Sequence, residues 1–83
     1  MNTIKFYGSL KNKIGNDVVK LKLGNLTVHE VQEKLQQDFN LEDFDITNFL
    51  VAINGVEISA LEGINSKISE GDEISIITLV HGG

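Results

Sequence analysis

Residues 27–39 read TVHEVQEKLQQDF, and this stretch contains the signals of one amphipathic helix. Thr27 and Glu30 have the spacing of a capping box, in which two side chains satisfy backbone amides at the helix start. Leu26 and Val31 stand at the positions of a hydrophobic staple. Apolar residues then recur at helical spacing and form one stripe: Val28, Val31, Leu35 and Phe39. The stretch therefore predicts a helix with a single buried face.

Strand patterns lie on both sides of this helix. Alternating or continuous apolar runs predict five strands, at residues 3–7, 18–23, 50–53, 56–58 and 73–79. Turn residues at 15–17 join the first two strands into a hairpin. Asn54-Gly55 joins the third and fourth, because both central residues of this turn type take positive φ. A short helical turn is expected around residues 60–62, and an acidic, irregular connection at 40–48.

The order of these elements predicts the fold. One helix covers only one face of a sheet, and short connections with a right-handed crossover place the first and last strands in the middle as parallel neighbours. This arrangement is an α+β fold, the β-grasp (ubiquitin-like) fold, with a mixed sheet of about five strands and one main helix packed across one face. The expected core consists of Ile4, Phe6, Val19, Leu21, Val31, Leu35, Ile53, Ile58, Ile74 and Ile76. We expect a domain at 1–79 and a flexible tail at 80–83.

Composition excludes several classes of function. The 83 residues contain no cysteine, so no disulfide and no cysteine nucleophile is available. Twelve acids against seven lysines give a net charge of −5, which disfavours nucleic acid as a partner. No apolar run is long enough to span a bilayer and no signal sequence stands at the start, so a cytoplasmic protein without membrane contact is expected.

No internal active site emerges from the motifs. The chain has no phosphate-binding loop and no serine in a nucleophile-elbow context. Asp43 and Asp45 alternate in a loop, and such acids are usually solvated rather than metal ligands. The acidic cluster at residues 70–73 is interpreted as a turn, and His29 as a neutral surface residue, because a charged imidazole in a first helical turn opposes the helix dipole. No metal site and no bound cofactor are predicted.

The end of the sequence, Val80-His81-Gly82-Gly83, is the most informative segment. Two successive glycines at a fixed place arise by chance in about 0.5% of chains. Taken alone, the two glycines are explained as well by a frayed end or a cloning remnant as by a function. The β-grasp order that precedes them favours a function, since residues without Cβ can thread a narrow channel on another protein.

Several segments together resemble the ubiquitin-like sulfur carriers of the MoaD/ThiS family, typified by the small subunit of molybdopterin synthase and the thiamine-pathway carrier. The resemblance covers the whole chain and rests on residues 4–8, 51–55 and 70–74 and on Gly82-Gly83. It implies that an E1-like adenylyltransferase activates Gly83 with its own ATP and magnesium, and that a persulfide donor then supplies sulfur to form a thiocarboxylate. Gly82 would give access to the partner's active site. The chain would be a carrier rather than a stand-alone catalyst, at most the small subunit of a molybdopterin synthase-type sulfurtransferase.

Members of this family dock partners through the outer face of the sheet, and the resemblance implies the same surface here. The matching positions are Tyr7 and Ile77, followed by the segment Leu79-Val80-His81 before the glycines. A single exposed isoleucine needs no explanation, but an exposed tyrosine beside it makes a patch and favours docking. Glu57 departs from the family, which often has an apolar residue there.

Two further features leave the pathway open. Molybdopterin-type members usually have a proline pair where this chain has Thr78-Leu79, and the ending at residues 79–83 also resembles the ubiquitin-related modifier of tRNA thiolation. The length favours a molybdopterin or tungstopterin role, with the large subunit of molybdopterin synthase or another sulfur acceptor as partner. The alternatives are a modifier joined through Gly83 to lysines, and a non-catalytic β-grasp interaction module.

Overall fold

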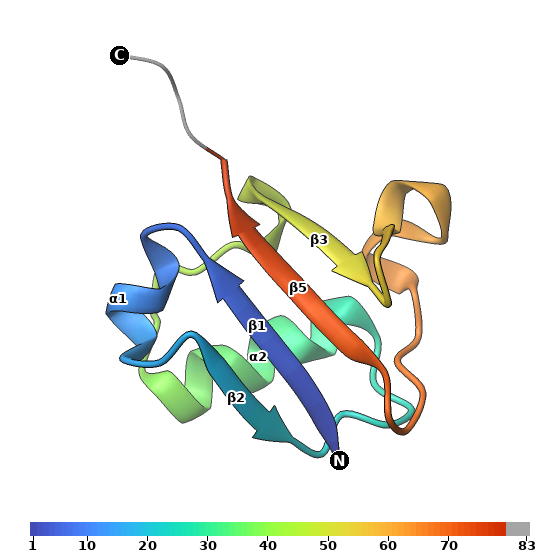
Figure 1. The fold of residues 1–83 in the computed structure, drawn as a ribbon, viewed down its shortest axis with the longest axis horizontal. Coiled ribbons are helices and arrows are strands. Elements are labelled where there is room, and N and C mark those ends of the chain that lie inside the picture. Colours follow the sequence, from blue (N-terminus) through green and yellow to red (C-terminus); the bar gives the residue numbers. More distant parts are fainter. Residues whose placement is uncertain (80–83) are drawn as a thin grey trace.

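The computed structural model describes residues 1–79, and within them a five-stranded sheet is crossed on one face by a helix (Figure 1). The strands and helices follow one another as β1 (Asn2–Tyr7), α1 (Leu10–Ile14), β2 (Val18–Leu21), α2 (Val28–Phe39), β3 (Phe49–Ile53), β4 (Val56–Glu57) and β5 (Glu73–Thr78). Single 3-10 turns lie at Ile46–Asn48, Ile58–Ala60 and Gly63–Asn65.

The strands are arranged in the order β2-β1-β5-β3-β4, which confirms the predicted β-grasp topology. β1 and β5 are parallel neighbours in the centre, with Ile4 opposite Ile74 and Phe6 opposite Ile76. β3 pairs antiparallel with β5 on the other side. The first and last strands of the domain are therefore hydrogen-bonded to each other. Figure 1 shows α2 behind them.

The core lies between the sheet and α2. It consists of Ile4, Phe6, Leu10, Ile14, Leu23, Val28, Val31, Leu35, Phe44, Ile46, Val51, Ile53, Ile68, Ile74 and Ile76. Three residues predicted for the core, Val19, Leu21 and Ile58, are only half-buried and pack against its margin. They lie on or beside the edge strands β2 and β4, at the margins of the sheet.

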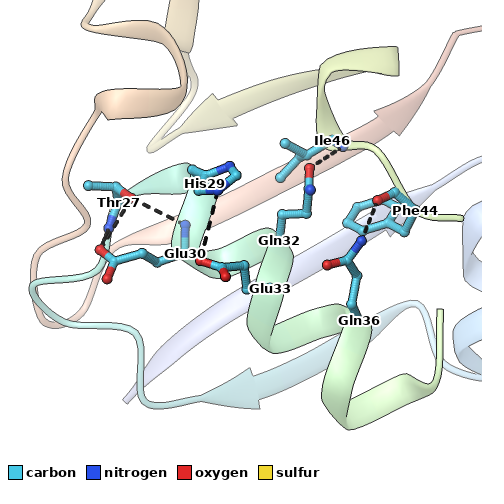
Figure 2. Close-up of polar contacts among 8 residues, drawn as sticks. All are labelled: Thr27, His29, Glu30, Gln32, Glu33, Gln36, Phe44 and Ile46. Carbon is cyan, nitrogen blue, oxygen red and sulfur yellow. Dashed lines mark hydrogen bonds and ion pairs between the residues drawn. The ribbon is translucent and has the colours of Figure 1, made fainter. Parts of the chain in front are cut away.

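The predicted capping box at the start of α2 is present (Figure 2). The backbone amide of Glu30 donates to Thr27 Oγ1 at 3.2 Å, and the amide of Thr27 donates to Glu30 Oε1 at 2.9 Å. One turn further, Gln32 Oε1 accepts from the amide of Ile46 at 2.8 Å, and Gln36 Nε2 donates to the carbonyl of Phe44 at 2.9 Å. These two glutamines fasten the α2–β3 connection to the helix.

The capping box makes the stability of the fold depend on pH. Hydrogen bonds from the Thr27 amide and hydroxyl hold the pKa of Glu30 below its ordinary value of 4.5. A carboxyl whose pKa is lowered by folding stabilises the native state above its unfolded pKa, and this contribution is lost as the pH falls through the folded pKa. We therefore expect Glu30→Gln to be less stable than the parent chain at pH 7, and the difference in the free energy of unfolding, measured with urea, to narrow as the pH falls below about 4.5. Glu33→Gln, the same charge change outside the box, should not show this convergence.

The connection between β1 and β2 differs from the predicted simple turn. It contains the five-residue helix α1, whose Leu10 and Ile14 are one turn apart and are both buried in the core. Gly15 ends the helix with φ +89°, and its amide donates to the Lys11 carbonyl at 2.9 Å. β2 also ends at Leu21 rather than at residue 23. The two strands are nevertheless antiparallel neighbours, as predicted.

Asn2 is a buried polar residue that ties three segments together. Its Nδ2 donates to the carbonyls of Ser69 at 2.8 Å and Asp72 at 3.1 Å, and its Oδ1 accepts from the amide of Leu23 at 3.1 Å. A buried amide with all of these partners stabilises the fold, whereas the loss of one partner leaves an unpaired group. Asn2 thus fixes the start of β1 to the turn that precedes β5.

Candidate functional site

The C-terminal end of β5 is fixed to the end of β1. The Thr78 hydroxyl donates to the Tyr7 carbonyl at 3.1 Å and accepts from the Leu10 amide at 3.3 Å. Between them, Gly8 has φ +84°, and a Cβ atom placed there would lie 2.7 Å from Thr78 Cβ. The β1–α1 junction therefore rests directly on Thr78, which sets the position and direction of the chain at Leu79.

An apolar strip crosses the outer face of the sheet just before this point. Tyr7 of β1 is the register partner of Ile77 of β5, and Ile77 is the partner of Leu50 of β3. Tyr7 is 46% exposed and Leu50 36%, whereas Ile77 is half-buried between them. We call these three residues the outer patch. Leu79, two residues beyond Ile77, is 47% exposed.

The predicted site residues fall into two groups. Tyr7, Ile77 and Leu79 lie together around the outer patch, on the side of the sheet opposite the core, as the strand alternation predicts. Val80, His81, Gly82 and Gly83 lie outside the described residues. The structure adds Leu50, which the sequence pattern shows only as part of an undivided apolar run. The one signal that could have found it is strand alternation from Ile53, an expected core residue, because a position three residues away lies on the opposite side of a strand.

Charged residues flank the outer patch along the central strands. Lys5 Nζ of β1 lies 3.2 Å from Glu73 Oε1 of β5, and both side chains are partly exposed on the outer face. The hydrogen bond to Glu73, together with its charge, raises the pKa of Lys5. The outer face is therefore apolar near the end of β5 and polar near its start. A partner that covers the end of β5 meets the apolar part first.

Asp45, a candidate metal ligand, and Glu57, which departs from the family, both accept hydrogen bonds from nearby residues. Asp45 Oδ1 accepts from both the amide and the hydroxyl of Thr47, at 3.0 and 2.6 Å, and these bonds lower the pKa of Asp45. Glu57 accepts from the amide of Ser59 in the same way, with a lowered pKa. His29 is exposed, with Nε2 3.9 Å from Glu33 Oε1. Within residues 1–79, no three His, Asp or Glu side chains gather where they could hold a metal ion.

One open groove of about 490 Å³ lies beside the acidic connection between α2 and β3. Leu10, Lys13, Leu41, Phe44, Asp45 and Phe49 are among its lining residues. It lies on the opposite face of the sheet from the outer patch, since Phe49 of β3 packs against the core whereas its neighbour Leu50 faces outward. Among the helices that the structure describes, none has the length and apolar character needed to cross a membrane.

The strand order and the single helix across one face define a ubiquitin-like β-grasp protein, and the outer patch lies beside the end of its last strand. The sequence model of the ThiS family matches residues 4–83. The chain therefore belongs to the ThiS family of ubiquitin-like sulfur carriers. Comparison with curated proteins finds no match.

Solved structures share this fold over nearly the whole chain. Small archaeal modifier protein 1 (SAMP1) from Methanosarcina acetivorans is 25% identical, with a TM-score of 0.79 over 99% of this chain and 95% of that one. The BexX/CysO complex of Amycolatopsis orientalis contains a chain that is 21% identical, with a TM-score of 0.78 and full coverage of both chains. The complex of subunits 1 and 2 of molybdopterin-converting factor from Helicobacter pylori gives 22% identity and a TM-score of 0.65, over 99% of this chain and 97% of that one.

Proposed function

We propose that this chain carries sulfur as a thiocarboxylate on Gly83 and delivers it to a partner that makes molybdopterin or tungstopterin. The observation that supports this most strongly is the match of the ThiS family model, which extends through Gly82 and Gly83. The fold also supports the proposal, because the hydrogen bonds of Thr78 fix the end of β5, the strand after which residues 80–83 follow in the sequence.

The proposed chemistry has two stages, both on partner enzymes. A carboxylate oxygen of Gly83 attacks the α-phosphorus of ATP, and pyrophosphate leaves, which yields an acyl adenylate. A persulfide sulfur on the donor then attacks the acyl carbon, and AMP leaves. A second thiol cleaves the resulting acyl disulfide, so that the donor side is oxidised to a disulfide and Gly83 keeps the terminal sulfur as a thiocarboxylate. ATP and magnesium belong to the E1-like partner.

The decisive experiment follows both stages on the full chain. The protein is incubated with a candidate E1-like enzyme and ATP, and pyrophosphate release is measured. A persulfide donor is then added, and intact mass spectrometry tests whether one oxygen of the chain has been replaced by sulfur. Absence of pyrophosphate release with every E1-like enzyme of the native cell would refute the proposal.

Docking on that enzyme is assigned to the outer patch, and this gives a further prediction. Leu50→Asp places a charge in the patch, so we expect the KM of the E1-like enzyme for the chain to rise at least about tenfold, as for a central contact residue. The value of kcat should stay the same, because Leu50 does not reach the reacting carboxylate. Val56→Asp is the matched control: Val56 of β4 is 45% exposed, lies beside the opposite end of β3, and should leave KM within about twofold. Equal effects of the two changes would contradict a docking role.

A second candidate function is a protein modifier joined through Gly83 to lysines of target proteins. It is favoured by the 25% identity to a protein named as a modifier and by Thr78-Leu79 in place of a proline pair. Digestion of proteins from the native cell distinguishes the two functions. A modifier leaves a glycine remnant on target lysines, whereas a dedicated carrier leaves none.

A further inference from the structure

The charges of this acidic chain are divided unevenly. Residues 1–24 contain five lysines and one acid, a net charge of +4. Residues 25–83 contain two lysines and eleven acids, a net charge of −9, and the two parts together give −5. The basic part consists of β1, α1 and β2 and the residues that follow β2.

In the folded chain, four of these five lysines lie on β2, just beyond it, or on the helix that precedes it. β2 is the edge strand next to β1, and α1 precedes it on the same side of the molecule (Figure 1). Lys11 and Lys13 of α1 are exposed, as are Lys20 of β2 and Lys22 just beyond it. We call these four residues the basic edge.

The backbone of β2 also presents unused hydrogen-bonding groups at this edge. The amide of Phe6 donates to the carbonyl of Asp17 at 2.8 Å, so Phe6 and Asp17 form a hydrogen-bonded pair of the antiparallel ladder. Such pairs alternate along a ladder, and the register continues with Val18 opposite Lys5 and Lys20 opposite Thr3. The amides and carbonyls of Val18 and Lys20 therefore point away from β1. Among residues 1–79, no strand lies on that side of β2.

The side chains along β2 extend the same pattern. Val18 is 42% exposed and shares the outer face with Lys20, whereas Val19 and Leu21 on the inner side are half-buried at the margin of the core. A strand laid beside β2 would place alternate side chains near the lysines and near this apolar margin. The edge thus favours a partner strand whose outward side chains are acidic and whose inward side chains are apolar.

We propose that the edge of β2 binds an extended acidic segment of a partner protein by strand addition. Backbone hydrogen bonds to Val18 and Lys20 supply the pairing, and the basic edge selects carboxylates. Lysines on an edge strand also discourage pairing with a like strand. A second copy of this chain is therefore a poor occupant, because β2 against β2 brings two basic edges together. The proposal requires nothing from residues 80–83 and is independent of sulfur transfer.

The test uses the full chain, labelled with ¹⁵N, and a blocked heptapeptide of the sequence Val-Asp-Val-Asp-Val-Asp-Val. We expect hydrogen exchange at the amides of Val18 and Lys20 to slow at least about tenfold when the peptide is bound. The amides of Val19 and Leu21, which already face β1, should change little. A peptide of the same composition with its three aspartates together at one end should bind at least about fivefold more weakly.

Two matched variants separate local recognition from net charge. Lys20→Glu should weaken binding at least about fivefold, because it replaces attraction by repulsion at the edge. Lys67→Glu makes the same charge change at an exposed lysine outside the basic part and should alter binding less than about twofold. If a variant fails to fold, hydrogen exchange on the unaltered chain still tests the proposal.

Four outcomes of the peptide experiments would overturn the proposal. They are no binding at about 1 mM peptide, equal binding of the two peptides, equal weakening by Lys20→Glu and Lys67→Glu, and resonance changes centred on the outer patch. A dimer paired through β2 in the absence of peptide, seen by sedimentation and by the same exchange pattern, would assign the edge to self-association instead.

Discussion

Deletion of Gly83 is expected to reduce sulfur loading of the chain at least about 1,000-fold while leaving its free energy of unfolding unchanged. Each residue contributes about 3.5 Å of reach in an extended chain, and a displacement of about 1 Å from reactive geometry already costs about 100-fold in rate. The acyl group of the shortened chain therefore stops short of the α-phosphorus of ATP. Stability is unaffected because the core is built from residues 4–76. Pyrophosphate release and intact mass measure the first effect, and urea unfolding the second.

Gly83→Ala is the control that keeps the length of the chain. It retains the carboxylate at the right reach and adds one methyl group, so its loss of loading should be much smaller than that of the deletion. Loading of the Gly83 deletion at the parental rate would refute the assignment of the reacting carboxylate. Loss of loading together with loss of folded structure would point to an unforeseen structural role.

The second large effect is expected at Gly8. Gly8→Ala should lower the free energy of unfolding by about 3 kcal/mol, from left-handed strain and from crowding. The φ of +84° disfavours any L side chain, and the new Cβ would lie 2.7 Å from Thr78 Cβ. For a domain of this size, the melting temperature should fall by about 15 °C. Thermal unfolding followed by circular dichroism measures this change.

Gly15→Ala isolates the backbone contribution. Gly15 has a closely similar φ of +89°, but no atom lies within 4 Å of a Cβ placed there. This variant should therefore lose only about 1 kcal/mol. If both substitutions cost the same, then the contact between Gly8 and Thr78 is not tight, and the end of β5 is held by hydrogen bonds alone.

The fold is predictable from the sequence because its main elements carry strong local signals. The capping box at Thr27 and the apolar stripe through Leu35 specify α2, and Asn54-Gly55 specifies the β3–β4 turn, where φ is +51° and +81°. The helix α1 escapes prediction because five residues are too few to establish a helical period. Its only trace is the spacing of Leu10 and Ile14. The buried role of Asn2 is equally hidden, since two of its three partners are carbonyls about seventy residues away.

The candidate site is predictable in part, for a different reason. Strand alternation places Tyr7 and Ile77 on the outer face, but Leu50 joins them only through the register of β3 against β5. The contact of Thr78 with Gly8 likewise depends on the parallel pairing of the two end strands. Register between distant strands is set by packing in three dimensions, and it cannot be inferred from a single sequence. The roles of Gly82 and Gly83 rest on the family resemblance and remain predictions.

The central position of β5 has a consequence for synthesis on the ribosome. A nascent chain that ends at residue 72 has β1 and β3 but no strand to lie between them, and it lacks the buried side chains of Ile74 and Ile76. Such a chain cannot close its sheet, so it stays open to proteases. Translation must pass Thr78 before the native state is reached. We therefore expect prematurely terminated products to be degraded, so that native molecules are those translated through the last strand.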